Sequence, residues 1–180
     1  MLVGGLGQIG EELTPALTYV YGKENILVTD IHEKSLTNYQ QLNALDYDSF
    51  KKVAQDFKPS IILHLPALLS ASSEKDCFRA ININNDTFLN AIKVSLDVKS
   101  KLFCPSSISA YGFNKEADRL NINEETYQRP KFLYGVTKVY MELLGNYFAE
   151  KHGLDFRSLR YPGVLSSVKP FGGTTDFAIS

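Results

Sequence analysis

A tyrosine and a lysine four residues apart form a pair that could carry out proton chemistry. Tyr134 and Lys138 stand at positions i and i+4 of a helical pattern, so they lie on one face of the helix. A phenol is a poor base at neutral pH, but an ammonium group one helical turn away stabilises the phenolate. Such a pair also arises by chance on a solvated helix face. It therefore indicates a general base only in combination with other features.

Two serines supply a second group suited to that chemistry. The stretch CPSSISAYG follows an apolar run and places Ser106 and Ser107 where a strand is expected to end. The carboxyl ends of parallel strands are the edge at which α/β sheets bind ligands. A serine hydroxyl at that edge can hold a substrate oxygen beside the phenol.

The chain begins with glycines at a spacing typical of a dinucleotide-binding turn. The stretch MLVGGLGQIG places Gly4, Gly7 and Gly10 between a predicted strand and a predicted helix. Gly4 permits the tight turn, Gly7 lets the backbone approach a pyrophosphate, and Gly10 allows close packing. The amides at the start of the helix, around Gln8 and Ile9, favour an anion. A tight turn without a ligand is the alternative interpretation.

Two aspartates extend the predicted cofactor site. The second strand ends ILVTD, so Asp30 lies about 20 positions after the glycines, where an acidic side chain accepts hydrogen bonds from the adenosine ribose. Asp30 would repel a 2′-phosphate, which favours NAD over NADP. Asp46, after the third expected strand, is placed to meet the adenine amino group. Either aspartate could instead cap a helix or a turn.

These residues must be positioned by alternating strands and helices. Continuous apolar runs predict buried parallel strands at 1–3, 26–29, 61–65, 101–104 and 156–161, with a short strand around 42–45. Helical patterns occupy 9–21, 49–57, 74–96 and 132–151. The fold class we predict is therefore α/β, a Rossmann-like doubly wound parallel sheet with helices on both faces. The polar interval 114–130 is expected to be a surface excursion.

Composition excludes several classes of partner. The 180 residues carry a net charge of −1, which argues against binding to nucleic acid or to an anionic membrane surface. No apolar run approaches the length of a membrane span, and no signal or transit peptide is visible. Cys77 and Cys104 are expected to be reduced core thiols, and the three histidines lack neighbours at metal-ligand spacing. We expect a cytoplasmic protein without a metal site.

In their order along the chain, the glycine turn, Asp30, the serines and the tyrosine–lysine pair resemble the extended short-chain dehydrogenases/reductases. This broad group holds nucleotide-sugar epimerases, dehydratases and some amino-acid dehydrogenases. Relatives are mitochondrial in some lineages. The family's catalytic serine, tyrosine and lysine match Ser107, Tyr134 and Lys138. The resemblance implies that NAD is the cofactor, that Lys138 also holds its ribose, and that Tyr134 lies against it as well.

The same resemblance implies further cofactor contacts. The segment HLPALLSA resembles the end of the family's fourth strand, where Leu65 and Ala67 would pass the cofactor. Asn82 resembles a helix asparagine beside the nicotinamide. Tyr161 and Pro162, after the last strand, fall at the nicotinamide end of the cleft.

Five short segments narrow the resemblance to the short-chain type of L-threonine 3-dehydrogenase: GQIG, LLSA, PSSISAYG, RYPG and GGTTD. This resemblance implies that Tyr134 removes the proton of the L-threonine side-chain hydroxyl, with hydride transfer giving 2-amino-3-oxobutanoate. Thr174 and Thr175, with Ser70, would bind the carboxylate and ammonium of this small-molecule substrate, and Ser107 would bind its hydroxyl.

The sequence departs from the family pattern at its first strand, at Pro66 and in its length. Only three residues precede Gly4, so the first strand should pair weakly, and Pro66 stands where the family has a small alanine. We expect a chain truncated at its C-terminus, with an NAD-binding domain at 1–162 and the start of a substrate-binding region at 163–180. A nucleotide-sugar epimerase or dehydratase and a non-catalytic NAD-binding fragment remain alternatives.

A homodimer is a further possibility implied by the resemblance, because the family often pairs through the helix that carries the tyrosine and lysine. Apolar residues at Val139, Leu143, Leu144 and Phe148 would allow this pairing, although core packing explains the same stripe.

Overall fold

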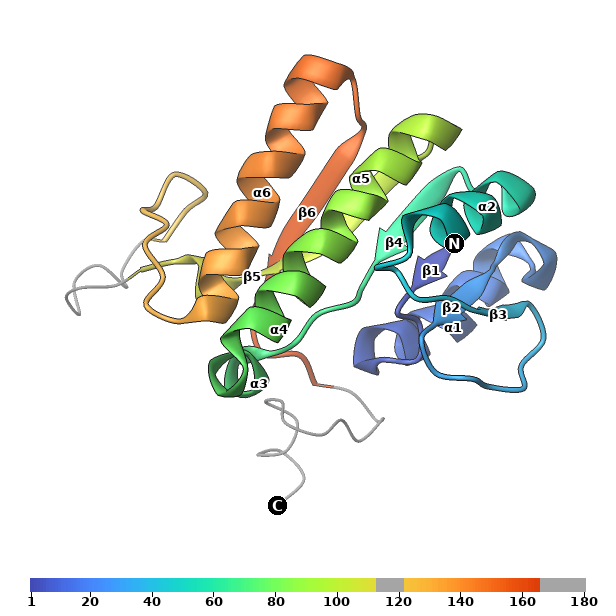
Figure 1. The fold of residues 1–180 in the computed structure, drawn as a ribbon, viewed down its shortest axis with the longest axis horizontal. Coiled ribbons are helices and arrows are strands. Elements are labelled where there is room, and N and C mark those ends of the chain that lie inside the picture. The colour runs from blue at the N-terminus through green and yellow to red at the C-terminus, as the bar shows by residue number, and fades with distance from the viewer. Residues whose placement is uncertain (113–121, 166–180) are drawn as a thin grey trace.

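The computed structural model describes residues 1–112 and 122–165, which form one parallel sheet flanked by helices (Figure 1). Six strands are hydrogen-bonded in the order β3-β2-β1-β4-β5-β6. Their bounds are β1 Leu2–Val3, β2 Val28–Asp30, β3 Tyr39–Gln41, β4 Ile61–His64, β5 Lys101–Ser107 and β6 Phe156–Tyr161. The order reverses between β1 and β4, as in doubly wound sheets. The predicted α/β Rossmann-like fold is confirmed.

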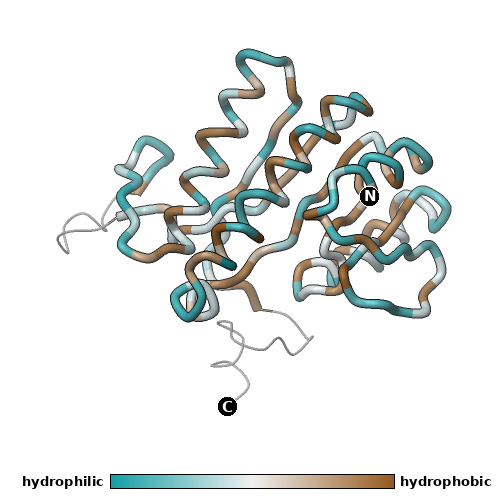
Figure 2. Tube along the Cα trace, in the orientation of Figure 1, coloured by the Kyte–Doolittle hydropathy of each residue, from teal (hydrophilic) through white to brown (hydrophobic). Residues whose placement is uncertain are grey.

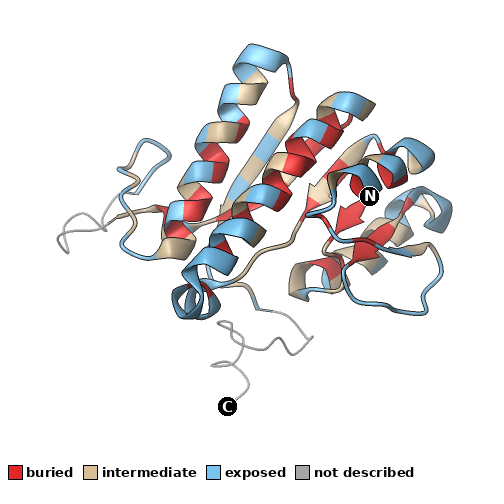
Figure 3. Cartoon of the chain, in the orientation of Figure 1, coloured by how far each residue is buried: buried red, intermediate tan, exposed pale blue. Residues whose placement is uncertain are grey.

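The helices are divided unequally between the two faces of the sheet. Their bounds are α1 Gln8–Tyr21, α2 Tyr47–Phe57, α3 Ser70–Lys75, α4 Cys77–Ile81, α5 Thr87–Val98 and α6 Leu133–His152. One core cluster joins Phe50 of α2, Phe88 of α5 and Met141 of α6 to the sheet. On the opposite face, Leu2 and Val28 pack against α1. Apolar residues accordingly follow the central strands, and the buried sides of α5 and α6 face the sheet (Figures 2 and 3).

The first strand is better held than its length predicts. Leu2 pairs with Val28 on one side and with Leu63 on the other, so β1 occupies the centre of the sheet. The Thr29 hydroxyl also donates to the Leu2 carbonyl at 3.0 Å. The expected weak pairing is thus offset by bonding along both edges, and the glycine turn starts from a buried strand.

Two predicted elements differ from the structure. The third strand lies at Tyr39–Gln41 rather than around 42–45. It is a polar edge strand, while the apolar signal came from Leu42 and Ala44, which are buried just after it. The predicted helix 74–96 is divided at Asp76, whose side chain accepts from the Arg79 amide and starts α4.

Between α4 and α5 the chain forms a π-helical turn at Asn82–Asp86. Such turns insert one extra residue per turn and often occur at functional sites. Short 3-10 turns lie at Lys23–Asn25 and Ile108–Ala110.

The two cysteines occupy different environments. Cys104 is buried, and this burial raises the pKa of its thiol to about 11, whereas Cys77 is exposed. The prediction of two core thiols was therefore wrong for Cys77. Within residues 1–112 and 122–165, no group of three His, Cys, Asp or Glu side chains could hold a metal ion. No helix in the described part of the chain is long and apolar enough to cross a membrane.

Candidate functional site

The glycine turn between β1 and α1 has the geometry that the spacing predicts. Gly4 adopts a φ of +72°, and a Cβ atom there would lie 2.9 Å from the Pro66 nitrogen. A Cβ atom on Gly10 would lie 2.4 Å from the Gly5 carbonyl oxygen, so α1 packs directly on the turn. A Cβ atom on Gly7 would meet only the Gly4 oxygen, at an ordinary 3.5 Å. The chain's own packing therefore explains Gly4 and Gly10 but leaves space above Gly7.

Asp30 lies beside this turn at the end of β2. Its carboxylate accepts from the Leu6 amide at 3.0 Å and from the His32 amide at 3.2 Å, and the residue is buried. These bonds fix the carboxylate next to the glycine turn. Because a carboxylate can accept about four hydrogen bonds, capacity for ribose hydroxyls remains.

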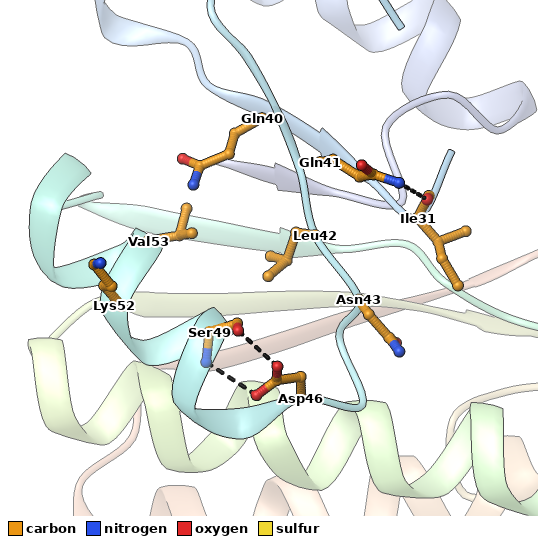
Figure 4. A pocket seen from close by; sticks show the side chains of 9 residues that line it. All are labelled: Ile31, Gln40, Gln41, Leu42, Asn43, Asp46, Ser49, Lys52 and Val53. Carbon is orange, nitrogen blue, oxygen red and sulfur yellow. Dashed lines mark hydrogen bonds between the residues drawn. The ribbon is translucent and has the colours of Figure 1, made fainter. Parts of the chain in front are cut away.

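Asp46 caps α2. Its carboxylate accepts from the Ser49 amide at 3.0 Å and from the Ser49 hydroxyl at 2.6 Å, and these bonds lower its pKa. The helix cap considered for this residue is therefore present, and adenine contact stays a prediction. Asp46 also lines a cavity of about 430 Å³ together with Ile31, the residue after Asp30 (Figure 4).

The predicted base and its lysine come together on the buried side of α6. The Lys138 ammonium lies 5.3 Å from the centre of the Tyr134 ring. It also donates to the Pro105 carbonyl at 2.7 Å, and Lys138 is only 7% exposed. The same contact attaches α6 to β5 two residues before Ser107.

Ser107 lies where β5 meets the first turn of α6. Its hydroxyl accepts from the Ser109 amide at 3.1 Å and so caps the 3-10 turn that follows. A Cβ atom on Gly135 would lie 2.1 Å from the Ser109 carbonyl oxygen. Because Gly135 follows Tyr134 directly, this close contact brings the predicted serine and tyrosine to the same end of the sheet.

Of Asn82 and Asn84, it is Asn84 that faces the interior. Asn82 is exposed and donates to Asp86 at 2.6 Å. Asn84 accepts from the Leu68 amide at 2.7 Å and donates to the Leu68 carbonyl at 3.2 Å and to the Thr137 hydroxyl at 3.1 Å. It therefore joins the loop after β4, which carries Leu65 and Ala67, to α6 between the predicted base and its lysine. A cofactor contact of Asn82 stays a prediction.

The remaining predicted residues lie around the same edge of the sheet. Tyr161 ends β6 and is partly buried, Pro162 follows it and is exposed, and Ser70 is the exposed first residue of α3. Gln8 donates to the Val164 carbonyl at 3.2 Å, so α1 contacts the segment after β6. Thr174 and Thr175 lie outside the described residues.

Sequence reasoning missed a nearly buried ion pair beneath this edge. Arg160 of β6 donates to Glu142 of α6 at 2.7 Å, and their side chains are 20% and 10% exposed. Burial alone would raise the pKa of Glu142, but hydrogen bonds from Arg160, Ser106 and Gln128 lower it. The sequence offered one signal for Glu142: it stands one helical turn beyond Lys138 and therefore on the same face of the helix.

The described residues fit a dinucleotide. The space above Gly7, the first-turn amides of α1 and the Asp30 carboxylate lie along the carboxyl ends of β1 and β2. Such an arrangement suits a pyrophosphate followed by an adenosine ribose. Lys138 and Tyr134 lie on the other side of the reversal in strand order, where the reacting end would come.

Comparisons with known proteins agree with this geometry. Residues 1–176 match the family described as the NAD dependent epimerase/dehydratase family. An uncharacterized epimerase/dehydratase of Staphylococcus saprophyticus is 41% identical over 186 aligned residues, covering 99% of this chain and 58% of the relative. L-threonine 3-dehydrogenase of Trypanosoma brucei superposes with a TM-score of 0.90 at 37% identity, covering 99% of this chain and 57% of that one. L-threonine dehydrogenase of Phytophthora infestans gives a TM-score of 0.91 at 36% identity, covering 98% and 58%.

The chain thus spans 57–58% of the length of these relatives. The shared part contains the glycine turn, the Asp30 strand end and the helix that carries Tyr134 and Lys138.

Proposed function

The chain belongs to the NAD dependent epimerase/dehydratase family, and from that premise we propose that it oxidises the side-chain hydroxyl of L-threonine to 2-amino-3-oxobutanoate. NAD is the cofactor, as the sequence predicted. The observation that carries the substrate assignment is the 37% identity, at a TM-score of 0.90, to an L-threonine 3-dehydrogenase over 99% of this chain.

In this proposal the residues at the β5–α6 junction divide the chemistry among them. Tyr134, as the phenolate, accepts the proton of the threonine hydroxyl, and Ser107 holds that oxygen in place. Lys138, whose ammonium lies 5.3 Å from the centre of the Tyr134 ring, stabilises the phenolate and binds the ribose of the cofactor. When bound, NAD supplies the hydride acceptor for the carbon that carries the hydroxyl. General-base catalysis of this kind typically contributes about 10²–10⁴-fold to the rate.

The cofactor contacts in the proposal follow the carboxyl edge of the sheet. Gly4, Gly7, Gln8, Ile9 and Gly10 bind the pyrophosphate side, and Asp30 binds the ribose. The other cofactor residues proposed are Asp46, Leu65, Ala67, Asn82, Tyr161 and Pro162, and the inward-facing Asn84 is an additional candidate.

For the substrate, we propose Ser70, Thr174 and Thr175 as the groups that bind the amino acid's charged ends. Residues 1–162 form the cofactor domain in this scheme, and 163–180 begin the substrate-binding region.

A homodimer belongs to the same proposal, through a stripe of α6 that shares only Leu143 with the one predicted. Leu144 and Phe148 pack against the core. The exposed apolar residues are Val136, Tyr140, Leu143 and Tyr147, which share one face of the helix.

The test of the function is NADH formation at 340 nm with NAD and L-threonine. Wild type should produce NADH, and Tyr134→Phe should reduce kcat by at least about 10²-fold because the base is removed. NAD should bind both proteins with similar affinity in calorimetry, since the glycine turn and Asp30 are unchanged.

A parallel panel separates the alternatives. Turnover of a nucleotide sugar without turnover of threonine would assign the chain to the epimerase or dehydratase branch. NAD binding without turnover of any substrate would identify a cofactor-binding fragment.

A further inference from the structure

The Glu142 carboxylate lies where four segments of the reaction end meet. The Ser106 hydroxyl of β5 donates to one carboxylate oxygen, and Gln128 donates to the other at 2.6 Å. Arg160 of β6 donates to both oxygens through Nε at 3.0 and 3.1 Å, and to one of them through Nη2 at 2.7 Å. A nearly buried carboxylate with this many donors is held in one orientation.

Two of these donors, and Glu142 itself, stand close in sequence to residues of the proposed site. Ser106 precedes Ser107, and Arg160 precedes Tyr161, while Glu142 follows Lys138 by one helical turn. Lys138 donates to the Pro105 carbonyl at 2.7 Å. Successive residues of β5 are therefore tied to successive turns of α6 just before the strand reaches Ser107.

Arg160 extends the cluster outward. Its Nη1 donates to the Tyr111 hydroxyl at 2.8 Å and to the Glu124 carbonyl at 3.2 Å. Arg160 and Glu142 together thus attach the loop before α6 to the ends of β5 and β6.

We propose that Glu142 is a positioning residue, which fixes the carboxyl ends of β5 and β6 against α6 so that Ser107 and Tyr161 keep their places relative to Tyr134. The inference rests on the proposed function, in which Ser107 holds the substrate hydroxyl. Glu142 acts through Ser106 and Arg160 and takes no proton itself.

Ser106→Ala is the variant that tests this role. A substitution of Glu142 would leave the Arg160 charge buried without a partner and could unfold the chain. Ser106→Ala removes only one hydroxyl and keeps the ion pair. Ser158→Ala is the matched control, because the Ser158 hydroxyl joins β6 to β5 by donating to the Cys104 carbonyl at 2.8 Å, further from the reaction end.

Two readouts are measured on the full chain. In Ser106→Ala, kcat with L-threonine should fall about tenfold while KM for NAD stays unchanged, since small displacements of a positioned group are costly. Amide hydrogen exchange at 107–109 should be about tenfold faster. Ser158→Ala also removes one hydrogen bond, so its Tm should fall by about as much as the Tm of Ser106→Ala. Its kcat should stay within about twofold of wild type, and amide exchange at 107–109 should be unchanged.

Equal loss of kcat in the two variants, or equal exchange at 107–109, would overturn the positioning role. If wild type does not oxidise L-threonine, the proposed function fails instead. The exchange comparison then decides the role of Glu142 alone, because it requires no turnover.

Discussion

At the scale of single residues, Gly7 and Gly10 are glycines for different reasons, and substitution separates these reasons. Gly10→Ala should destabilise the fold by about 1–3 kcal/mol, because its Cβ atom would lie 2.4 Å from the Gly5 oxygen. Gly7→Ala should leave stability nearly unchanged, since its Cβ atom meets only an ordinary contact at 3.5 Å. Its NAD affinity should nevertheless fall about tenfold or more, because the methyl group occupies the space for the pyrophosphate.

Urea unfolding and calorimetric titration with NAD measure both effects in each variant. An NAD affinity of Gly7→Ala equal to that of wild type would exclude the pyrophosphate from this turn.

His64 makes stability depend on pH. Burial, and secondarily the Lys138 charge, lowers its pKa to about 3 from the usual value near 6.5. Between these values the unfolded chain binds a proton that the folded chain does not. The contribution of neutral His64 to the free energy of unfolding is therefore complete above about pH 6.5. It decreases by about 1.4 kcal/mol per pH unit as the pH falls toward 3.

The measurement is the free energy of unfolding in urea at pH 7.5, 6.0 and 5.0. His64→Gln, whose amide can still reach the Thr87 hydroxyl that His64 contacts at 3.0 Å, should show a smaller decrease than wild type. The exposed control His32→Gln should follow wild type. Parallel curves for His64→Gln and wild type would contradict this prediction.

At the scale of secondary-structure elements, α6 depends on a cap from a distant helix. Phe132 provides no side-chain cap, and Glu74 of α3 instead accepts from the Leu133 amide at 2.8 Å. Glu74→Ala should cost about 0.5–1 kcal/mol in the free energy of unfolding, while Glu74→Gln keeps an acceptor and should recover part of it.

Glu150→Ala is the control at the other end of the same helix. A negative charge there opposes the helix dipole, so its removal should be neutral or slightly stabilising. A loss in Glu150→Ala equal to that in Glu74→Ala would mean that the cap has no special role.

The elements also show how far the sequence predicts this protein. Buried strands and long amphipathic helices were found because their apolar periodicity is strong, and the glycine turn because only glycine fits Gly4 at a φ of +72°. The polar edge strand Tyr39–Gln41 was displaced because its pairing comes from backbone contacts with β2 that leave no apolar pattern. Within the π-helical turn Asn82–Asp86, Asn84 faces inward whereas Asn82 is exposed, and no apolar pattern distinguishes the two positions.

Site residues that act through long-range contacts were the least predictable. The spacing of Tyr134 and Lys138 is local and was read directly. The partners of Glu142 come from β5, β6 and the loop before α6, so no window of sequence contains them together.

At the scale of the whole molecule, the exposed stripe of α6 predicts self-association. Leu143 is 61% exposed in the middle of that stripe. Wild type should elute at twice the monomer mass in size-exclusion chromatography with light scattering, and Leu143→Glu should elute as a monomer, because a charge is costly within an apolar interface. Tyr19→Glu, at an exposed aromatic residue of α1, is the control and should behave as wild type. A monomeric wild type would contradict the prediction.

The order of the strands has a consequence for synthesis. β1 is the centre of the finished sheet, yet it precedes all its neighbours in the chain. β1, β2 and β3 are complete at Gln41, whereas β4 begins only at Ile61. At about 5–20 residues per second, a translating ribosome needs about one to four seconds to cover that interval. During those seconds one edge of β1, the future middle of the sheet, has no strand to pair with.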